Sequence, residues 1–301
     1  MRGLFPEPVL AALSEAPDKP AIERGGVSVS RGELLLTVRR IAGAMHEAGL
    51  RRGIGVGVLL PLTPQAYAAH LAAHALGCRV APARPAWGPE QLAFALTKVD
   101  VVLSERPLDT VLAAKPGDGG QDGAVRKAGE RTLLLGDLLD GEPLETMQAR
   151  PEDPARMIFT SGSTGRPKAC VHSYRAMTLA YQKEHWPQPL TRLMTGFRRC
   201  LVHQSLAAPV QFTYLGRCLV AGGMAVFPDG PSGPELDLAA MIEKLRPTAT
   251  MVHPARLREI LQTGNDLSSL EALMLGGSPA APTLLREAAP EPEVDVSGAR
   301  P

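Results

Sequence analysis

The middle of the chain carries the nonapeptide Thr160-Ser161-Gly162-Ser163-Thr164-Gly165-Arg166-Pro167-Lys168. A short apolar run leads into it and another leads out, and a helical pattern starts near Ser173, which predicts strand, loop, strand and helix. Two glycines let the backbone bend tightly and turn its N–H groups toward an anion. Three hydroxyls add donors, Lys168 adds a positive charge, and Pro167 stiffens the exit. This composition predicts a phosphate-binding loop.

A plain surface turn is the alternative, since short Gly/Ser turns are common. Such a turn needs glycine and proline but not three hydroxyls followed by a lysine, so the composition favours phosphate binding. The loop is not of the Walker type, which has four residues between its glycines and ends in Gly-Lys-Ser/Thr. Here only Ser163 and Thr164 separate the two glycines.

Composition limits the class of protein. The chain has 301 residues, 45% of them hydrophobic, which is enough for a sizeable core and more than one lobe. Its 32 basic and 31 acidic residues give a net charge of +1, and no basic block indicates a nucleic-acid partner. The prolines near the N-terminus argue against a signal peptide, and no apolar stretch is long enough for a membrane span. The cysteines lack a C-x-x-C pair, which fits reduced thiols in a cytoplasmic protein; they are Cys78, Cys170, Cys200 and Cys218.

Predicted strands and helices alternate along the chain, which indicates a parallel α/β sheet. Ser30 and Glu33 form a capping box, Thr63 caps the next long helix, and Gly25-Gly26 closes a hairpin. The predicted strands cover residues 21–23, 27–29, 56–60, 79–82, 101–103, 133–135, 248–252 and 270–275. The predicted helices cover 9–16, 34–48, 63–76, 89–97, 173–184 and 236–245, with another from Pro254. Residues 115–130 are polar and glycine-rich and are expected to form an exposed loop.

The central loop resembles the signature Thr-Ser-Gly-Ser/Thr-Thr-Gly-x-Pro-Lys-Gly of the AMP-forming synthetase and ligase superfamily. Nine consecutive positions match, and Ala169 then replaces the usual glycine. Segments 30–34, 59–61 and 76–78 resemble the family's preceding elements in the right order. The resemblance implies parallel-rich sheets flanked by helices, as in the front part of the family's large N-terminal domain. It also suggests a first lobe of about 1–156, a second lobe of about 157–290 carrying the loop, and an unstructured tail, 291–301.

The tetrapeptide Gly276-Gly277-Ser278-Pro279 resembles the family's turn beside the adenine ring and the floor of the acyl pocket. Glycines without Cβ let a flat group approach the backbone, although an ordinary strand-to-helix turn is the alternative. The resemblance gives Thr164 and Lys168 the role of stabilising charge on phosphate. The residues expected to contact nucleotide are Thr160, Ser161, Gly162, Ser163, Thr164, Gly165, Lys168, Gly276, Gly277, Ser278 and Pro279.

Three histidines lie near these motifs. His203 is a weak candidate for the acyl pocket, because Pro209 follows it where the family places a proline before its histidine. His172 is given a supporting role by the resemblance, and a lone histidine such as His185 is more often a hydrogen-bonded structural group. We predict no metal ligand among these residues.

Several family elements are not found in these residues. They are the barrel subdomain, the Tyr-Gly-x-Thr-Glu segment whose glutamate helps to hold Mg²⁺, the aspartate that binds ribose, and the C-terminal domain with its lysine. The resemblance therefore implies ATP and Mg²⁺ as cofactors, with the main carboxylate ligand of Mg²⁺ outside this chain. Little turnover is expected from the 301 residues alone, and another chain could supply the missing portion.

The function implied by the resemblance is ATP-dependent adenylation of a small carboxylic acid, followed by thioester formation with CoA or a carrier thiol. An acyl-CoA ligase of fatty acid metabolism is preferred to a peptide-synthetase domain. Two alternatives remain open: a non-catalytic remnant that binds nucleotide or a partner protein, and a broken gene product without a settled fold. The pocket-lining segments do not identify the acid.

Overall fold

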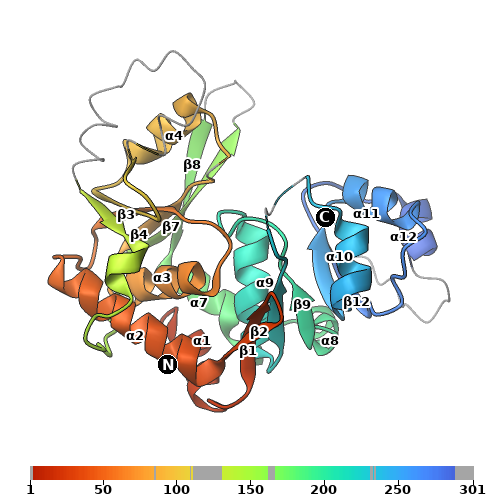
Figure 1. Ribbon diagram of the computed structural model, residues 1–301, viewed down its shortest axis with the longest axis horizontal. Helices are drawn as coiled ribbons and strands as arrows, with labels where there is room; N and C mark the ends of the chain where they lie inside the picture. Colours follow the sequence, from red (N-terminus) through yellow and green to blue (C-terminus); the bar gives the residue numbers. More distant parts are fainter. Residues whose placement is uncertain are drawn as a thin grey trace.

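The computed structural model describes residues 3–84, 86–108, 110, 131–161, 167–230, 233 and 235–288, which form two six-stranded sheets flanked by helices (Figure 1). The first sheet has the strand order β6-β5-β3-β4-β7-β8. All neighbours in it are parallel except β7 and β8, which are antiparallel. Its strands are β3 (Gly55–Leu59), β4 (Arg79–Pro82), β5 (Val101–Ser104), β6 (Thr132–Leu134), β7 (Pro154–Ser161) and β8 (Pro167–Ser173).

The second sheet repeats this plan with the order β12-β11-β9-β10-β1-β2. Its neighbours are parallel except at one edge, where β1 and β2 form an antiparallel hairpin. Its strands are β1 (Pro20–Arg24), β2 (Val27–Ser30), β9 (Arg199–Leu201), β10 (Met224–Phe227), β11 (Ala249–Val252) and β12 (Ala272–Leu275). The predicted fold class, parallel-rich sheets flanked by helices, is confirmed.

Helices connect and cover the strands. The α-helices are α1 (Glu7–Ser14), α2 (Arg31–Glu47), α3 (Pro64–Ala75), α4 (Pro89–Leu96), α7 (Tyr174–Tyr181), α8 (Gln188–Thr195), α9 (Pro209–Val220), α10 (Leu238–Leu245), α11 (Pro254–Leu261) and α12 (Pro282–Ala288). The short 3₁₀ helices are η1 (Leu135–Leu138) and η2 (Lys183–His185).

The division between the sheets does not follow the predicted lobe boundary at 156/157. Strands β7 and β8 complete the first sheet, and the hairpin β1–β2 joins the second, where Ile22 on β1 pairs with Ala225 on β10. The physical reason is that Ala21 and Ile22 are apolar and fully buried, and they gain this burial beside β10 rather than beside the strands that follow them in sequence. The predicted exposed loop at 115–130 and the predicted tail at 291–301 lie outside the described residues.

The helix caps and the tight turn that the sequence predicts are present. Ser30 and Glu33 make the capping box, with the Glu33 N–H donating to Ser30 Oγ at 3.2 Å and the Ser30 N–H donating to Glu33 Oε2 at 2.7 Å. The Thr63 hydroxyl accepts from the Ala66 N–H at 3.0 Å and caps α3. Gly25 and Gly26 have φ values of 61° and 73°, as the tight turn between β1 and β2 requires.

Helix α3 lies in the interior, and Figure 1 shows it between α2 and the strands of the first sheet. Each of its residues is buried apart from Gln65. A helix that is buried on all sides needs small side chains so that its neighbours can approach, and α3 is correspondingly rich in alanine. Its two histidines, His70 and His74, are therefore enclosed, with exposures of 2% and 0%.

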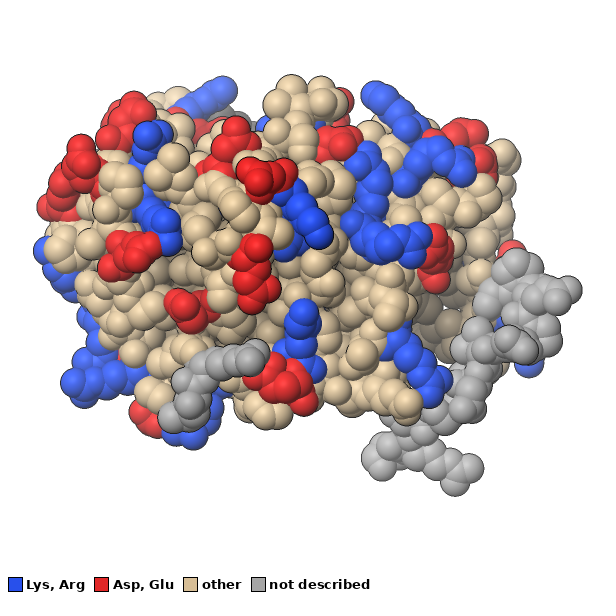
Figure 2. Space-filling model, turned by 90° about the horizontal axis from the view of Figure 1, so that it is seen from below, with Lys and Arg blue, Asp and Glu red and all other residues tan. Residues whose placement is uncertain are grey.

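The surface carries mixed charges. On the face shown in Figure 2, Lys and Arg side chains are interspersed with Asp and Glu. Within the described ranges, the helices are too short or too polar to cross a bilayer.

Candidate nucleotide-binding site

The predicted phosphate loop connects β7 and β8. The two strands are antiparallel, and their register pairs Thr160 with Lys168 and Ser161 with Pro167. Residues Gly162–Arg166 lie outside the described part of the chain. Lys168 is exposed and forms no ion pair with another described residue. The fold thus places an ammonium group at the start of the strand that leaves the loop.

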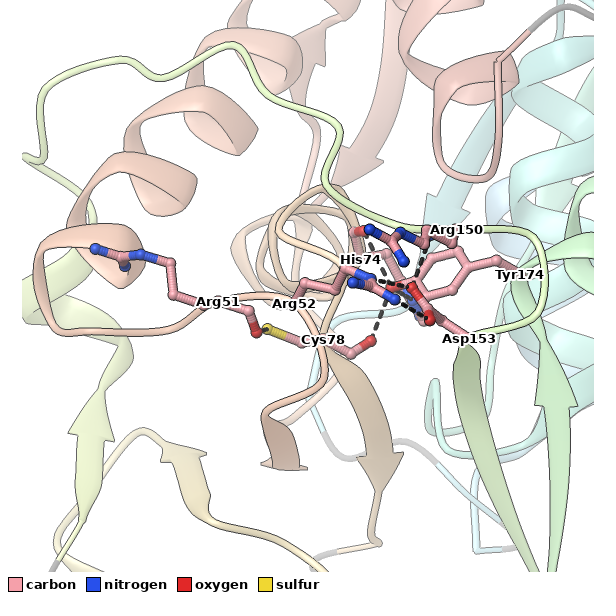
Figure 3. Close-up of polar contacts among 7 residues, drawn as sticks. All are labelled: Arg51, Arg52, His74, Cys78, Arg150, Asp153 and Tyr174. Carbon is pink, nitrogen blue, oxygen red and sulfur yellow. Dashed lines mark hydrogen bonds and ion pairs between the residues drawn. The ribbon is translucent and has the colours of Figure 1, made fainter.

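The base of this hairpin is anchored by Asp153, directly before β7 (Figure 3). Its carboxylate accepts hydrogen bonds from Arg52 Nε at 2.5 Å and Arg52 Nη2 at 2.8 Å, and from the Arg150 N–H at 2.7 Å. These bonds, chiefly those from Arg52, lower the pKa of Asp153. The Asp153 carbonyl accepts from the Tyr174 N–H at 3.0 Å, so both ends of the hairpin meet at this residue.

Tyr174 anchors the exit from β8 to the interior. Its hydroxyl lies 2.7 Å from the Cys78 carbonyl and 3.1 Å from the His74 carbonyl, as Figure 3 shows. Its ring meets the His74 ring edge-on at 5.7 Å. Burial raises the pKa of the Tyr174 phenol well above its usual value, so the hydroxyl stays a donor. The strand after the loop is therefore tied to the end of α3 and the start of β4.

The strand before the loop is covered by α4 and the segment leading to it. Phe159 on β7 meets Trp87 and Phe94 edge-on, with ring centroids 5.7 and 6.0 Å apart. Such edge-to-face pairs fix the orientation of the rings.

The second predicted element, Gly276-Gly277-Ser278-Pro279, follows β12. Gly277 has φ +93°, and a Cβ there would lie 2.6 Å from His253 Cδ2. Gly276 donates its N–H to the Val252 carbonyl at 3.2 Å. The nearest atom to a Cβ at Gly276 is Val210 Cγ2, at 3.8 Å. Gly277 thus requires glycine, whereas a Cβ at Gly276 would make an ordinary van der Waals contact with Val210 in the first turn of α9.

The phosphate loop and the glycine turn belong to different sheets, but each lies at the carboxyl end of a parallel strand. Strand β7 is parallel to β4 and β12 is parallel to β11, so each motif follows the carboxyl end of a parallel strand, where α/β sheets bind ligands. One hydrogen bond and a short stretch of chain relate them. Arg156 on β7 donates from Nη2 to the Leu206 carbonyl at 2.6 Å, and four residues further along the chain Val210 lies 3.8 Å from where a Cβ of Gly276 would be.

His203 is fixed by hydrogen bonds. Its side chain is 3% exposed, and Nε2 lies 2.9 Å from the Met251 carbonyl. A carbonyl can only accept, so Nε2 carries the hydrogen. Burial, the largest influence, lowers the pKa of His203. The residue joins β11 to the segment before α9, and its role in an acyl pocket stays a prediction.

The other two histidines differ in their contacts. His172 lies exposed on β8, and its supporting role also stays a prediction. His185 is hydrogen-bonded through Nδ1 to Gln182 Oε1 at 2.9 Å.

Sequence reasoning missed Arg156 and Val210. A charged residue among the apolar residues before the loop is unusual, and Arg156 could have been noticed in the sequence for that reason. Its burial, at 2% exposure, could not be predicted, because distant segments produce it. In the part of the chain that the structure describes, no group of three His, Cys, Asp or Glu side chains could hold a metal. We therefore assign no Mg²⁺ ligand here.

Comparison with known proteins shows the family of the chain. Residues 10–295 match the family described as AMP-binding enzyme. The chain belongs to this family of adenylate-forming ligases.

Curated relatives include a 3-hydroxybenzoate–CoA ligase from Aromatoleum sp., which is 35% identical over 177 residues, covering 56% of this chain and 33% of the relative. Acetyl-coenzyme A synthetase 2 from Candida glabrata is 28% identical over 312 residues, covering 89% of this chain and 44% of the relative. The chain thus spans less than half the length of these relatives. Their names give no support to a fatty acid as substrate.

Solved structures share the fold. The N-terminal subdomain of Klebsiella oxytoca NpsA, in complex with 3-hydroxyanthranilyl-AMSN, aligns with a TM-score of 0.77 and 19% identity over 96% of this chain and 70% of that one. Unliganded O-succinylbenzoate coenzyme A synthetase from Bacillus subtilis aligns with a TM-score of 0.74 and 18% identity over 95% of this chain and 57% of that one.

Proposed function

We propose that this chain carries the nucleotide-binding part of a ligase that adenylates a carboxylic acid. In the reaction, a carboxylate oxygen attacks the α-phosphorus of ATP, the bond to the β-phosphate oxygen breaks, and pyrophosphate leaves. The thiol of CoA or of a carrier then attacks the acyl carbon, forming a thioester and releasing AMP. Family membership supports this reaction class, and the whole protein's activity remains our proposal.

The observation that carries the proposal is the hydrogen bond from Arg156 on β7 to the Leu206 carbonyl, just before the helix whose Val210 lies next to Gly276. It relates the strand that leads into the hydroxyl-rich loop to the glycine turn of the other sheet. In the proposed role, Lys168 and the loop donors balance negative charge on phosphate oxygens during the displacement. Gly276 leaves the backbone without a side chain that would obstruct a flat group, whereas the corresponding side of Gly277 faces the His253 ring.

The acids to test first are flat aromatic carboxylates. The relative with 35% identity is named for 3-hydroxybenzoate. Gly276 also has no side chain that would keep a planar ring away from the backbone. CoA is the thiol acceptor to test first, because the same relative is named as a CoA ligase.

The experiment uses 3-hydroxybenzoyl-AMSN, the ligand of a solved NpsA complex. Calorimetry should show that the full chain binds this compound. Lys168→Ala should weaken binding about 10-fold to 100-fold, the value of one charge-assisted hydrogen bond. Lys183→Ala is the matched control, because Lys183 is an exposed lysine on η2. Absence of binding by the unchanged chain would refute the proposal.

Carboxylate-dependent pyrophosphate exchange by the same preparation separates the two function classes. Exchange with 3-hydroxybenzoate supports catalysis by these residues. Binding of the analogue without exchange instead favours a nucleotide-binding role for this chain.

A further inference from the structure

A guanidinium group and several rings surround Phe212 of α9 in the interior. The Cζ atom of Arg156 lies 3.9 Å from the centroid of the Phe212 ring, close enough for a cation–π contact. The rings of His70 and Tyr67, both on α3, meet Phe212 edge-on with centroids 5.4 and 5.8 Å away, and Phe5 lies at 6.0 Å. Three segments distant in sequence therefore meet at this one helix.

This cluster leaves an unusual share of its polar atoms without partners. Among the described residues, eight buried side-chain nitrogen or oxygen atoms lack a hydrogen bond. Four of them are Arg156 Nε, Arg156 Nη1, His70 Nδ1 and His74 Nε2. Buried polar groups in native proteins are normally paired. Half of the unpaired atoms thus lie in one place, around one charged residue.

Arg156 has no acidic partner in the described part of the chain. The titratable groups that act on it are the phenols of Tyr67 and Tyr181, while His70 and His74 feel its charge. Burial lowers the pKa of Arg156 to about 10, so the guanidinium stays charged at neutral pH. A buried charge without a partner destabilises a fold, and an apolar side chain of similar volume is often neutral or stabilising in its place.

The contacts that Arg156 does make all lead to α9. Its Nη2 donates to the carbonyl of Leu206, three residues before the helix begins, and its guanidinium stacks on Phe212 in the first turns. The first turn also carries Val210, which faces Gly276. Arg156 itself lies on β7, four residues before Thr160, where the phosphate loop begins.

We propose that Arg156 is a positioning residue that fixes the first turn of α9 relative to the strand carrying the phosphate loop. This inference rests on the proposed function, because it assigns Arg156 to the acyl side of the adenylate site. The residue does not touch the ligand. It holds α9, and on the opposite side of this helix Val210 lies next to Gly276.

The test compares two ligands on one variant. AMP reports on the nucleotide part of the site alone, whereas 3-hydroxybenzoyl-AMSN also reaches the acyl part. For Arg156→Met we expect the affinity for AMP to stay within about 2-fold and the affinity for the acyl analogue to fall about 10-fold to 100-fold, as displaced groups near a reacting centre do. The melting temperature should not fall, since an unpaired charge is removed. A merely structural role would lower both affinities and the melting temperature together.

Arg31→Met is the matched control. Arg31 is also a buried arginine, 4% exposed, but it donates to the carbonyls of Ala12 and Gly223, both at 2.9 Å, away from the loop strand. We expect this variant to melt at a lower temperature and to keep the ratio of the two affinities. Arg156→Lys provides a second reading, because lysine keeps the charge but cannot both stack flat on Phe212 and reach Leu206.

The outcomes separate the two proposals. If the unchanged chain binds neither ligand, the proposed function fails and this inference fails with it. If the unchanged chain binds both, and Arg156→Met and Arg156→Lys preserve the affinity ratio, the inference alone is overturned. A chain with Arg156→Met that does not fold would also overturn it, since Arg156 would then be needed for stability.

Discussion

Gly277→Ala is expected to destabilise the protein through two separate effects. At φ +93° an L-residue is strained, which costs about 1–2 kcal/mol. The new Cβ would also lie 2.6 Å from Cδ2 of His253, a contact that cannot persist. His253 Nδ1 accepts from the Ala255 N–H at 3.3 Å and caps α11, so moving its ring weakens that cap, at about 0.5–2 kcal/mol. Together the effects amount to about 1.5–4 kcal/mol, with about 2–3 kcal/mol in the middle of that range.

Thermal unfolding followed by circular dichroism measures this loss. For a chain of this size, each kcal/mol lowers the melting temperature by about 2–4 °C, so the expected decrease is about 4–12 °C. Gly276→Ala is the neighbouring control, because its φ is not positive and its Cβ would meet nothing closer than 3.8 Å. That variant should stay within about 0.5 kcal/mol of the unchanged protein.

Equal melting temperatures for the two alanine variants would refute this reasoning. They would show that the turn after β12 does not hold Gly277 in the left-handed region against His253. The second glycine of the motif would then have no conformational reason to be glycine.

Stability should fall as the pH is lowered below about 6.5. Burial holds the pKa values of His70 and His74 well below those in the unfolded chain, so the unfolded state binds more protons in this range. Each histidine should lower the free energy of unfolding by up to about 1.4 kcal/mol per pH unit. Urea unfolding between pH 7.5 and 5 measures this slope, and His70→Leu should reduce it by about a third to a half, because His74 and the buried His203 still contribute; an unchanged slope contradicts the burial argument. Tyr174→Phe should cost about 1–2 kcal/mol, since the one hydroxyl hydrogen shared between the Cys78 and His74 carbonyls is lost; a urea midpoint equal to that of the unchanged protein would contradict it.

Features set by neighbouring residues could be predicted from the sequence. The capping box at Ser30 and Glu33, the turn at Gly25-Gly26 and the bounds of β4 all appear where the pattern placed them. Each depends on a few consecutive residues and on backbone angles that only certain side chains allow. The glycine turn after β12 belongs to this group, because the requirement at Gly277 is local.

Features set by distant segments could not be predicted in this way. The pairing of β1 with β10 joins residues about two hundred positions apart, and no local pattern distinguishes it from pairing with β3. Strand β9 has three residues, too few for a periodic signal, and its pairing with β10 and β11 defines it. For the site, the loop and the glycine turn were visible in the sequence, but the contacts through Leu206 and Val210 that join them were not.

The two buried arginines show why burial alone does not reveal a residue's role. Arg31 donates from both terminal nitrogens to backbone carbonyls, which links α1 to the turn before β10, and leaves only Nε without a partner. Arg156 satisfies one carbonyl and leaves Nε and Nη1 without partners. A fold optimised for stability alone would replace the second arginine and keep the first. Arg156 is unfavourable for stability, but it fixes the position of α9 beside the strand that leads to the phosphate loop. Our proposal that the protein requires this position explains why a buried arginine is present there.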